Sequence, residues 1–205
     1  MNRIITVGRE FGSGGREFGR RLAEILGIAY YDQEIIMEIV NQTKFSEQYV
    51  RNIIEQKPAI SFPIHAGRTF NMIGNTMVEQ SRMVYQKQCK VIREMAEKSD
   101  CVIVGRCADY ILREMRPYRI FLYAEMESKI KRCRINEPEH ENLTDKELQR
   151  KIKEVDKQRA RYYEFYTGQV WGVRINYDLC INSTNWTVKE SAEAVARFFM
   201  DHYKE

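Results

Sequence analysis

A run of glycines near the N-terminus, Gly12-Ser13-Gly14-Gly15, is the part of the sequence best suited to bind phosphate. Backbone N–H groups in such a turn, together with the positive end of a following helix, attract anions. Glycine is needed because a Cβ atom would block both the close approach of a phosphate and the unusual φ values. Arg16 follows and could reach a terminal phosphate, and Glu17 comes next. The segment predicts a nucleotide phosphate site, with a tight ligand-free connection as the alternative.

The first ligand hypothesis for this turn is the P-loop, GxxxxGK[ST], which follows a strand and opens a helix. With Gly15 as the second glycine of the pattern, Glu10 takes the place of the first glycine. Arg16 then replaces the lysine, and Glu17 replaces the serine or threonine. The pattern is matched only in part, so the loop alone leaves this hypothesis open.

The second hypothesis is the dinucleotide fingerprint, GxGxxG. Gly12 and Gly14 fit it, but Glu17 stands where the third glycine belongs. Asp32 lies at the end of an expected second strand, about 20 residues after the first glycine, where an acid would bind the ribose of a dinucleotide. The turn alone therefore does not separate a phosphate-transferring enzyme from a nicotinamide-dependent oxidoreductase.

Two further features could bind phosphate. Arg106 follows Gly105 and the apolar run Cys101–Val104, which places it at the carboxyl edge of a sheet, where α/β proteins bind ligands. An arginine fork can hold a phosphate there, although a surface ion pair is the alternative. Asp156 and Arg159 share one helix face, so the arginine could hold phosphate while the acid meets a ribose hydroxyl. A simple helical salt bridge is the alternative for that pair.

Residues 129–164 are densely charged, with eleven Lys/Arg against eight Asp/Glu. A capping box from Thr144 to Glu147 predicts that much of this segment is helical. Arg132 and Arg134 lie at its entrance, and on a movable lid they could neutralise the charge of a transferring phosphoryl group. A solvated helix face is the alternative. A basic lid favours phosphoryl transfer over dinucleotide chemistry, and the aromatic residues at 162–166 are predicted to anchor it to the core.

Short apolar stretches that alternate with amphipathic ones predict an α/β fold with a parallel sheet. Helical spacing begins at Phe18 and ends at Gly27, a predicted C-cap. A capping box from Thr187 to Glu190 opens the last helix. Residues 57–76, with two prolines and two glycines, predict an irregular insert. The expected strands are the apolar run from Ile4 to Val7 and the stretches Ile28–Tyr31, Cys101–Val104, Arg119–Leu122 and Asp178–Ile181.

The composition narrows the class of protein. A chain of 205 residues with 43% apolar and 30% charged residues fits one globular domain rather than a disordered chain. The sequence shows neither a bilayer-spanning apolar run nor a signal peptide, and its five cysteines lack CxxC spacing, which predicts reduced thiols and a cytoplasmic location. A net charge of +4 gives no reason to expect nucleic acid or membrane as a partner. The three histidines lack metal-ligand spacing.

Six runs of the sequence together carry a family resemblance: Ile5–Arg16, Leu22–Asp32, Val102–Ile111, Ile120–Leu122, Asp156–Tyr163 and Tyr177–Asn182. They resemble the cytidylate kinase-like proteins, a branch of the P-loop nucleoside monophosphate kinases. The resemblance covers nearly the whole chain. It implies a single domain with the three-layer P-loop kinase fold, a five-stranded parallel core (1–32, 99–128 and 165–205), an acceptor-binding insert at about 33–98 and a helical lid at about 129–164.

The resemblance also implies roles for single residues. The turn from Gly12 to Arg16 would cradle the phosphates of ATP, used together with Mg²⁺, and Arg106 would bind the phosphate of the acceptor. Asp156 would face the acceptor ribose, and Arg159 would bridge phosphates. Arg82, on the helix before the Cys101 strand, would lie near the acceptor base.

Some positions depart from true cytidylate kinases, and the departures concern the acceptor. Asp32 is kept, but Glu38 stands where those enzymes have an arginine that grips the acceptor phosphate. Cys107 stands where they offer an aspartate toward cytosine, although Asp109 is close by. The phosphate-binding groups are therefore kept in part, and the group that reads cytosine is not.

The sequence thus predicts ATP-dependent phosphoryl transfer to a small acceptor, most simply a nucleoside monophosphate. Arg16, Arg132 and Arg159 would spread over the transferring group, because charge neutralisation and positioning carry most of the rate of such reactions. A nucleotide-binding regulator without catalysis and a nicotinamide-dependent oxidoreductase are the alternatives. The sequence leaves the oligomeric state open.

Overall fold

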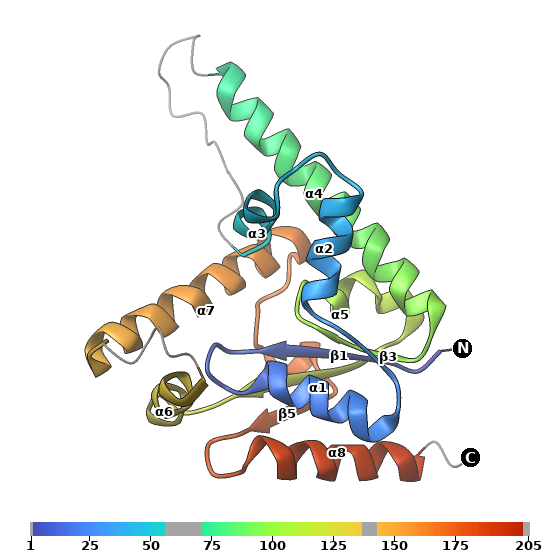
Figure 1. Cartoon of the computed structure of the whole chain (residues 1–205), viewed down its shortest axis with the longest axis vertical. Helices are drawn as coiled ribbons and strands as arrows, with labels where there is room; N and C mark the ends of the chain where they lie inside the picture. The colour runs from blue at the N-terminus through green and yellow to red at the C-terminus, as the bar shows by residue number, and fades with distance from the viewer. Residues whose placement is uncertain (1, 56–70, 137–142, 203–205) are drawn as a thin grey trace.

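The computed structural model describes residues 2–55, 71–136 and 143–202, and a five-stranded parallel sheet forms its centre (Figure 1). The strands are hydrogen-bonded in the order β2-β3-β1-β4-β5, which brings the first strand to the middle of the sheet. This arrangement confirms the predicted α/β fold. The strands are β1 (Ile4–Arg9), β2 (Ala29–Tyr31), β3 (Cys101–Val104), β4 (Tyr118–Tyr123) and β5 (Leu179–Asn182).

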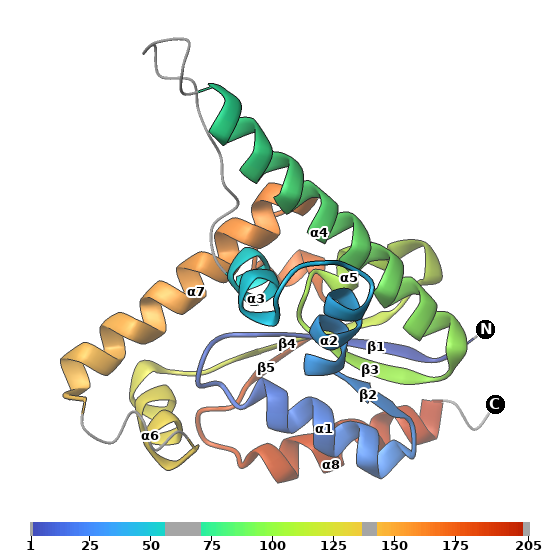
Figure 2. The same ribbon diagram turned by 45° about the horizontal axis from the view of Figure 1, so that its top comes forward.

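Both faces of the sheet are covered by helices, because successive side chains of the central strands point to opposite faces. Ile5 and Val102 belong to the core cluster under α1 and α8, whereas Ile4 and Ile103 belong to the cluster on the other face. Figures 1 and 2 show α1 and α8 side by side on one face, with the long α4 rising from the other. The covering helices are α1 (Gly15–Leu26) and α8 (Val188–His202), and opposite them α2 (Gln33–Asn41), α4 (Asn71–Lys98) and α5 (Ala108–Ile111).

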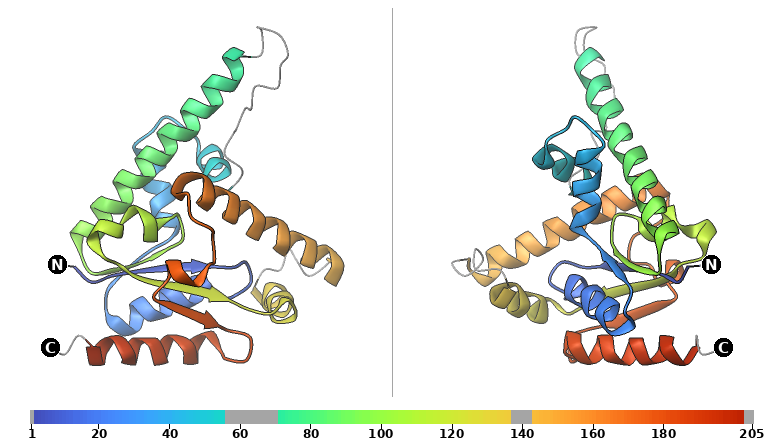
Figure 3. Two further views of the ribbon diagram at one scale, coloured as in Figure 1. Left: turned by 180° about the vertical axis from the view of Figure 1, so that it is seen from behind. Right: turned by 45° about the vertical axis from the view of Figure 1, so that its right-hand side comes forward.

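Two helices, α6 (Met126–Asn136) and α7 (Asp145–Thr167), occupy the charged segment of the sequence. Figure 3 shows α7 running from the core out toward α6 at the side of the molecule. Thr144 opens α7, where its hydroxyl accepts the N–H of Glu147, and this confirms the predicted capping box. The other short elements are α3 (Glu47–Glu55) and the 3₁₀ turns η1 (Arg113–Met115) and η3 (Arg174–Asn176).

The two halves of α7 are anchored differently. Near its start, Leu148 and Ile152 form a small cluster with Cys133 of α6, apart from the main core. Near its end, Tyr162 and Tyr163 are buried in the main core. The end of α7 is therefore fixed by the predicted aromatic packing, whereas its start depends on a satellite cluster.

The structure differs from the sequence prediction mainly before α4. Residues 71–76, predicted to be irregular, form the first turns of this 28-residue helix, and residues 57–70 lie outside the described part of the chain. One glycine inside a helix costs only about 1 kcal/mol, so Gly74 does not interrupt so long an element. Gly27 caps α1 in the left-handed conformation, as predicted. Across the described ranges, every helix is too short or too polar to cross a membrane.

Candidate functional site

The glycine-rich turn connects β1 to α1 at the carboxyl edge of the sheet. Gly12 and Gly14 have φ values of 75° and 85°, a conformation that glycine adopts without strain. The Ser13 hydroxyl donates to the carbonyl of Glu10 at 2.8 Å, and the Ser183 hydroxyl donates to the carbonyl of Ser13 at 2.8 Å. Gly14 is the N-cap of α1. The first N–H groups of that helix therefore lie at the turn, as an anion site requires.

Two cavities lie against this turn. The first, which we call the loop cavity, has a volume of about 290 Å³ and is formed by residues 9–12 and 14–17 together with Arg159 of α7, while Ser13 is buried beneath it. The second, which we call the inner cavity, has a volume of about 240 Å³ and extends from the end of β1 to Gly105 and Asp109, beyond β3. Aromatic side chains of α7 and of the segment 171–177 complete its wall.

Three guanidinium groups mark the boundary between the two cavities. Arg9, Arg16 and Arg159 line both of them. Burial, followed by the charge of Arg159, lowers the pKa of Arg9 to about 9, with smaller contributions from Arg106 and Arg16. Like charges held together out of water are unfavourable, and a bound anion relieves their repulsion. The boundary is therefore suited to a phosphoryl group.

Asp32 lies beneath this cluster and is only 2% exposed. One of its oxygens lies 2.6 Å from Nε of Arg16, and the other lies 3.8 Å from Nη2 of Arg9. This carboxylate offsets part of the charge of two arginines and fixes where they point. It lines neither the loop cavity nor the inner cavity.

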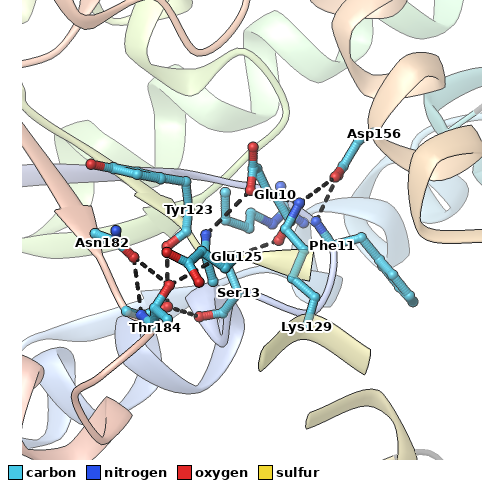
Figure 4. Close-up of polar contacts among 12 residues, drawn as sticks. Glu10, Phe11, Ser13, Tyr123, Glu125, Lys129, Asp156, Asn182 and Thr184 are labelled. Carbon is cyan, nitrogen blue, oxygen red and sulfur yellow. Dashed lines mark hydrogen bonds and ion pairs between the residues drawn. The ribbon is translucent and has the colours of Figure 1, made fainter. Parts of the chain in front are cut away.

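A second ionic network holds the outer side of the turn, as Figure 4 shows. Lys129 of α6 is nearly buried, and its ammonium lies 2.6 Å from Glu10 and 3.1 Å from Asp156 of α7. The N–H of Phe11 donates to the other oxygen of Asp156 at 2.6 Å. Burial raises the pKa of Asp156, although these partners act against the shift. The network ties the turn to both helices of the charged segment.

Arg106 and Asp109 follow β3 and line the inner cavity. Arg106 is 8% exposed and has a positive φ of 59°, and Gln88 of α4 donates to its carbonyl at 2.9 Å. Asp109 accepts a hydrogen bond of 2.7 Å from the hydroxyl of Tyr163, and burial raises its pKa. The sequence prediction that Arg106 stands at the carboxyl edge of the sheet is thus confirmed in position, beside an unexpected carboxyl–tyrosine pair.

Several predicted site residues do not line either cavity. Arg132 donates to the carbonyl and the hydroxyl of Ser183, and burial lowers its pKa. Arg134 pairs with Asp145, and Arg82 is exposed on α4. Glu17, by contrast, lines the loop cavity, but it pairs with Arg21 at 2.7 Å. The roles expected for Arg132 and Arg82 therefore stay predictions.

Two residues that line or contact the site, Arg9 and Lys129, were not predicted from the sequence. Arg9 lies three residues before Gly12, at the end of the strand that leads into the turn, and this position was a usable signal. Lys129 lies more than a hundred residues away, and nothing in its local sequence points to Glu10. Only the packing of α6 brings it there: a Cβ atom added to Gly12 would lie 3.0 Å from both Cβ and the carbonyl oxygen of Lys129.

The residues around the loop cavity fit a triphosphate, because left-handed glycines and a helix N-terminus provide the donors. Among residues 2–55, 71–136 and 143–202, no three His, Cys, Asp or Glu side chains gather as a metal site. Mg²⁺ is commonly held by phosphate oxygens with only one or two carboxylates, and Glu10 and Glu17 are the carboxylates that line this cavity. The strand order also departs from the 3-2-1-4-5-6 order of dinucleotide folds, which disfavours the nicotinamide hypothesis.

Comparison with known sequences places the chain among kinase relatives. The sequence model of the cytidylate kinase-like family matches residues 4–185. A curated protein named cytidylate kinase, from Methanopyrus kandleri, is 24% identical over 199 residues, which cover 92% of this chain and 88% of that protein.

Comparison with solved structures supports the same fold. An uncharacterised protein from Eubacterium ventriosum has a TM-score of 0.70 and 26% identity, over 98% of this chain and 99% of the other. Shikimate kinase from Acinetobacter baumannii, solved in complex with shikimate, has a TM-score of 0.52 and 16% identity, over 100% of this chain and 96% of the other. The second similarity shows the P-loop kinase fold alone.

Proposed function

The chain belongs to the cytidylate kinase-like family, and we propose that it transfers the γ-phosphoryl group of ATP to a small acceptor, most simply a nucleoside monophosphate. The observation that carries this proposal is the presence of Arg9, Arg16 and Arg159 on the walls of both cavities. A phosphoryl group in transfer carries negative charge on three oxygens, and guanidinium groups fixed around it neutralise that charge.

The two cavities suggest how the substrates divide the site. The loop cavity would hold the terminal phosphates of ATP on the N–H groups of the turn, while the inner cavity would hold the acceptor. Arg106 would bind the acceptor's phosphate through its fork. Asp109 and the aromatic side chains near it would then contact the rest of the acceptor. Asp156 and Lys129 would act by holding the turn in shape, since both contact it directly.

In the proposed reaction, an oxygen of the acceptor's phosphate attacks the γ-phosphorus while the bond to the β–γ bridging oxygen breaks. ADP leaves with that electron pair. The attacking oxygen is already ionised, so the reaction needs no general base. Glu10 or Glu17 would hold Mg²⁺, which would supply charge neutralisation to the phosphates of ATP. Most of the rate enhancement comes from positioning and from the three guanidinium groups.

The test is a phosphoryl-transfer screen. Pure protein would be incubated with Mg-ATP and a panel of acceptors (CMP, dCMP, UMP, AMP, GMP and non-nucleotide phosphates), and ADP formation would be followed above a blank without acceptor. We expect one acceptor to support many turnovers. Arg16→Ala should abolish most of that activity, whereas Arg20→Ala, which removes an exposed arginine from the same helix, should not.

Two negative outcomes would have different meanings. No turnover with any acceptor, while ATP still raises the melting temperature of the protein, would favour a nucleotide-binding regulator. No stabilisation by ATP would remove the nucleotide site itself from the proposal, and binding of NAD would then be measured.

A further inference from the structure

Gly15 has no conformational reason to be glycine. Gly12 and Gly14 have positive φ values, but Gly15 is the first residue of α1 and is not in the left-handed region. Glycine in a helix is disfavoured relative to alanine by roughly 0.5–1 kcal/mol. A packing reason must therefore keep a side chain away from this position.

The packing reason is the side chain of Arg9. A Cβ atom on Gly15 would overlap Cβ of Arg9 and lie 2.8 Å from its Cγ. A Cβ atom on Gly105, beyond β3, would overlap Nη1 of the same arginine and lie 2.7 Å from its Cζ. Arg9 thus runs between two glycines from distant parts of the chain, with its stem against the start of α1 and its guanidinium against Gly105.

The start of α1 also determines how the turn aligns with the P-loop pattern. In GxxxxGK[ST], the lysine directly follows the second glycine, where the loop passes into the helix. Because Gly14 is the N-cap, it takes the place of the second glycine, and Gly15 takes the place of the lysine. Arg9 then stands in the place of the first glycine. This alignment is shifted by one residue from the one that the sequence alone predicts, in which Arg16 replaces the lysine.

We propose that Arg9 is the phosphate-binding cation of this loop and takes over the role of the lysine in the P-loop pattern. The two positions have exchanged residue types: the cation stands where the pattern has its first glycine, and a glycine, Gly15, stands where the pattern has its lysine. The stem of Arg9 fills the space in which a side chain on Gly15 would begin. The exchange therefore keeps a positively charged side chain in the region that the lysine of the pattern would occupy. Arginine also differs from lysine in its planar fork. Since Arg9 lines both cavities, one fork can contact phosphates on either side of the boundary.

This inference deepens the proposed function and rests on it for catalytic turnover, but phosphate binding tests it without any acceptor. The experiment reverses the exchange in the full chain with Arg9→Gly, Gly15→Lys and the double variant. Binding of inorganic tripolyphosphate and of ATP would be measured by calorimetry at fixed ionic strength. Phosphoryl transfer would be measured with the acceptor found in the screen.

We expect Arg9→Gly to lower the affinity for tripolyphosphate roughly tenfold to a hundredfold, as loss of a charged hydrogen bond does. Gly15→Lys alone should also bind poorly, because its Cβ atom overlaps Arg9. The double variant should regain most of the affinity, since it restores a glycine at the first position and a lysine at the seventh. Recovery in the double variant is the outcome that a purely structural role of Arg9 does not produce.

Two controls separate loss of charge from loss of fold. Arg9→Gln keeps most of the side-chain stem and removes the charge, and its melting temperature shows whether the fold is intact. Arg20→Gln also removes one positive charge, but from α1, at a side chain that is 50% exposed. We expect Arg9→Gln to bind tripolyphosphate as weakly as Arg9→Gly, and Arg20→Gln to bind like the wild type.

Several outcomes would overturn the proposal. The first is a folded Arg9→Gln variant whose affinity for tripolyphosphate is within about twofold of the wild type. The second is a folded double variant that binds tripolyphosphate no better than Arg9→Gly does. The third is a wild-type protein that does not bind tripolyphosphate. An Arg9-dependent affinity in a protein that transfers no phosphoryl group would support the proposal and contradict the kinase activity. Phosphoryl transfer at the wild-type rate in Arg9→Gln would support the kinase activity and contradict the role proposed for Arg9.

Discussion

The loop cavity and the inner cavity share three arginines, but the chain builds them in different ways. Apart from Arg159, the loop cavity is formed by one short segment, residues 9–12 and 14–17, so its chemistry comes from backbone N–H groups and from glycines that expose them. The inner cavity is formed by side chains from separate segments, which include residues 105–109, 155–163 and 171–177. A phosphate needs only a short stretch of backbone, whereas a shaped acceptor needs side chains that the fold brings together from a distance.

The largest expected effect comes from a residue that the two cavities share. Arg159→Ala should lower kcat/KM for phosphoryl transfer by about a thousandfold, the lower end of the effect of an arginine that neutralises transition-state charge. Steady-state kinetics with both substrates varied would measure it. Arg150→Ala, which removes an exposed arginine from the same helix, is the matched control and should stay within about twofold of the wild type. Equal losses in both variants would mean that the net charge of α7, and not the shared boundary, matters.

The next effect should be confined to the inner cavity. Arg106→Gln should raise the KM of the acceptor roughly tenfold to a hundredfold, because a charged hydrogen bond is lost, and should leave the KM of ATP unchanged. The control is Arg113→Gln, at a side chain that is 51% exposed in the following 3₁₀ turn. A parallel rise in both KM values would contradict the division of the two substrates between the cavities.

A smaller effect should be confined to the loop cavity. Gly12→Ala and Gly27→Ala both place a side chain at positive φ, which costs roughly 1–2 kcal/mol in each case. Around Gly27 nothing lies within 4 Å of the added Cβ atom, but around Gly12 it would lie 3.0 Å from atoms of Lys129 and Cys133. We expect Gly12→Ala to be the less stable variant in denaturant unfolding, and the only one of the two to lose affinity for ATP. Equal ATP affinities would show that the packing of α6 on the turn does not shape the site.

The same contrast explains how far the sequence could predict the structure. The order of strands and helices, the caps at Gly27, Thr144 and Thr187, and the phosphate-binding turn all depend on patterns within about a dozen residues. Such patterns are visible in one sequence because neighbouring side chains share a helix face or a strand edge. The fold was therefore predictable, and so were the residues of the turn itself.

The rest of the site depends on contacts between distant segments. Arg9 was missed because its importance comes from the space left by Gly15 and Gly105, and the second of these lies on another strand connection. Lys129 was missed because only the packing of α6 brings it to the turn. The contact of Arg132 with Ser183 was missed because no spacing rule connects the two residues. Sequence patterns give a residue its element and face, but not its tertiary neighbour.

The smallest predicted effect concerns the charge state of the inner cavity. Burial raises the pKa of Asp109 above its usual 3.8, so the folded protein holds this proton more tightly than the unfolded chain does. Its contribution to stability is complete below about pH 4 and is lost as the pH rises through the raised value. An amide at this position cannot titrate. The melting temperature of Asp109→Asn should therefore rise by a few degrees relative to that of the wild type as the pH increases from about 4 to about 7.

Asp178 supplies a control with the opposite sign. Burial acts to raise its pKa, but the hydrogen bonds and charge of Arg119 outweigh that effect and lower it. Its contribution is complete above the unfolded value of about 3.8 and is lost as the pH falls below it, so Asp178→Asn should gain on the wild type only as the pH falls from about 4 toward 2. The melting temperatures of the two variants, each compared with the wild type, should therefore change with pH in separate windows: above about pH 4 for Asp109→Asn and below about pH 4 for Asp178→Asn. A difference between Asp109→Asn and the wild type that stays constant above about pH 4 would mean that the carboxyl of Asp109 is well solvated, and that the inner cavity does not exclude water from the place where an acceptor would bind.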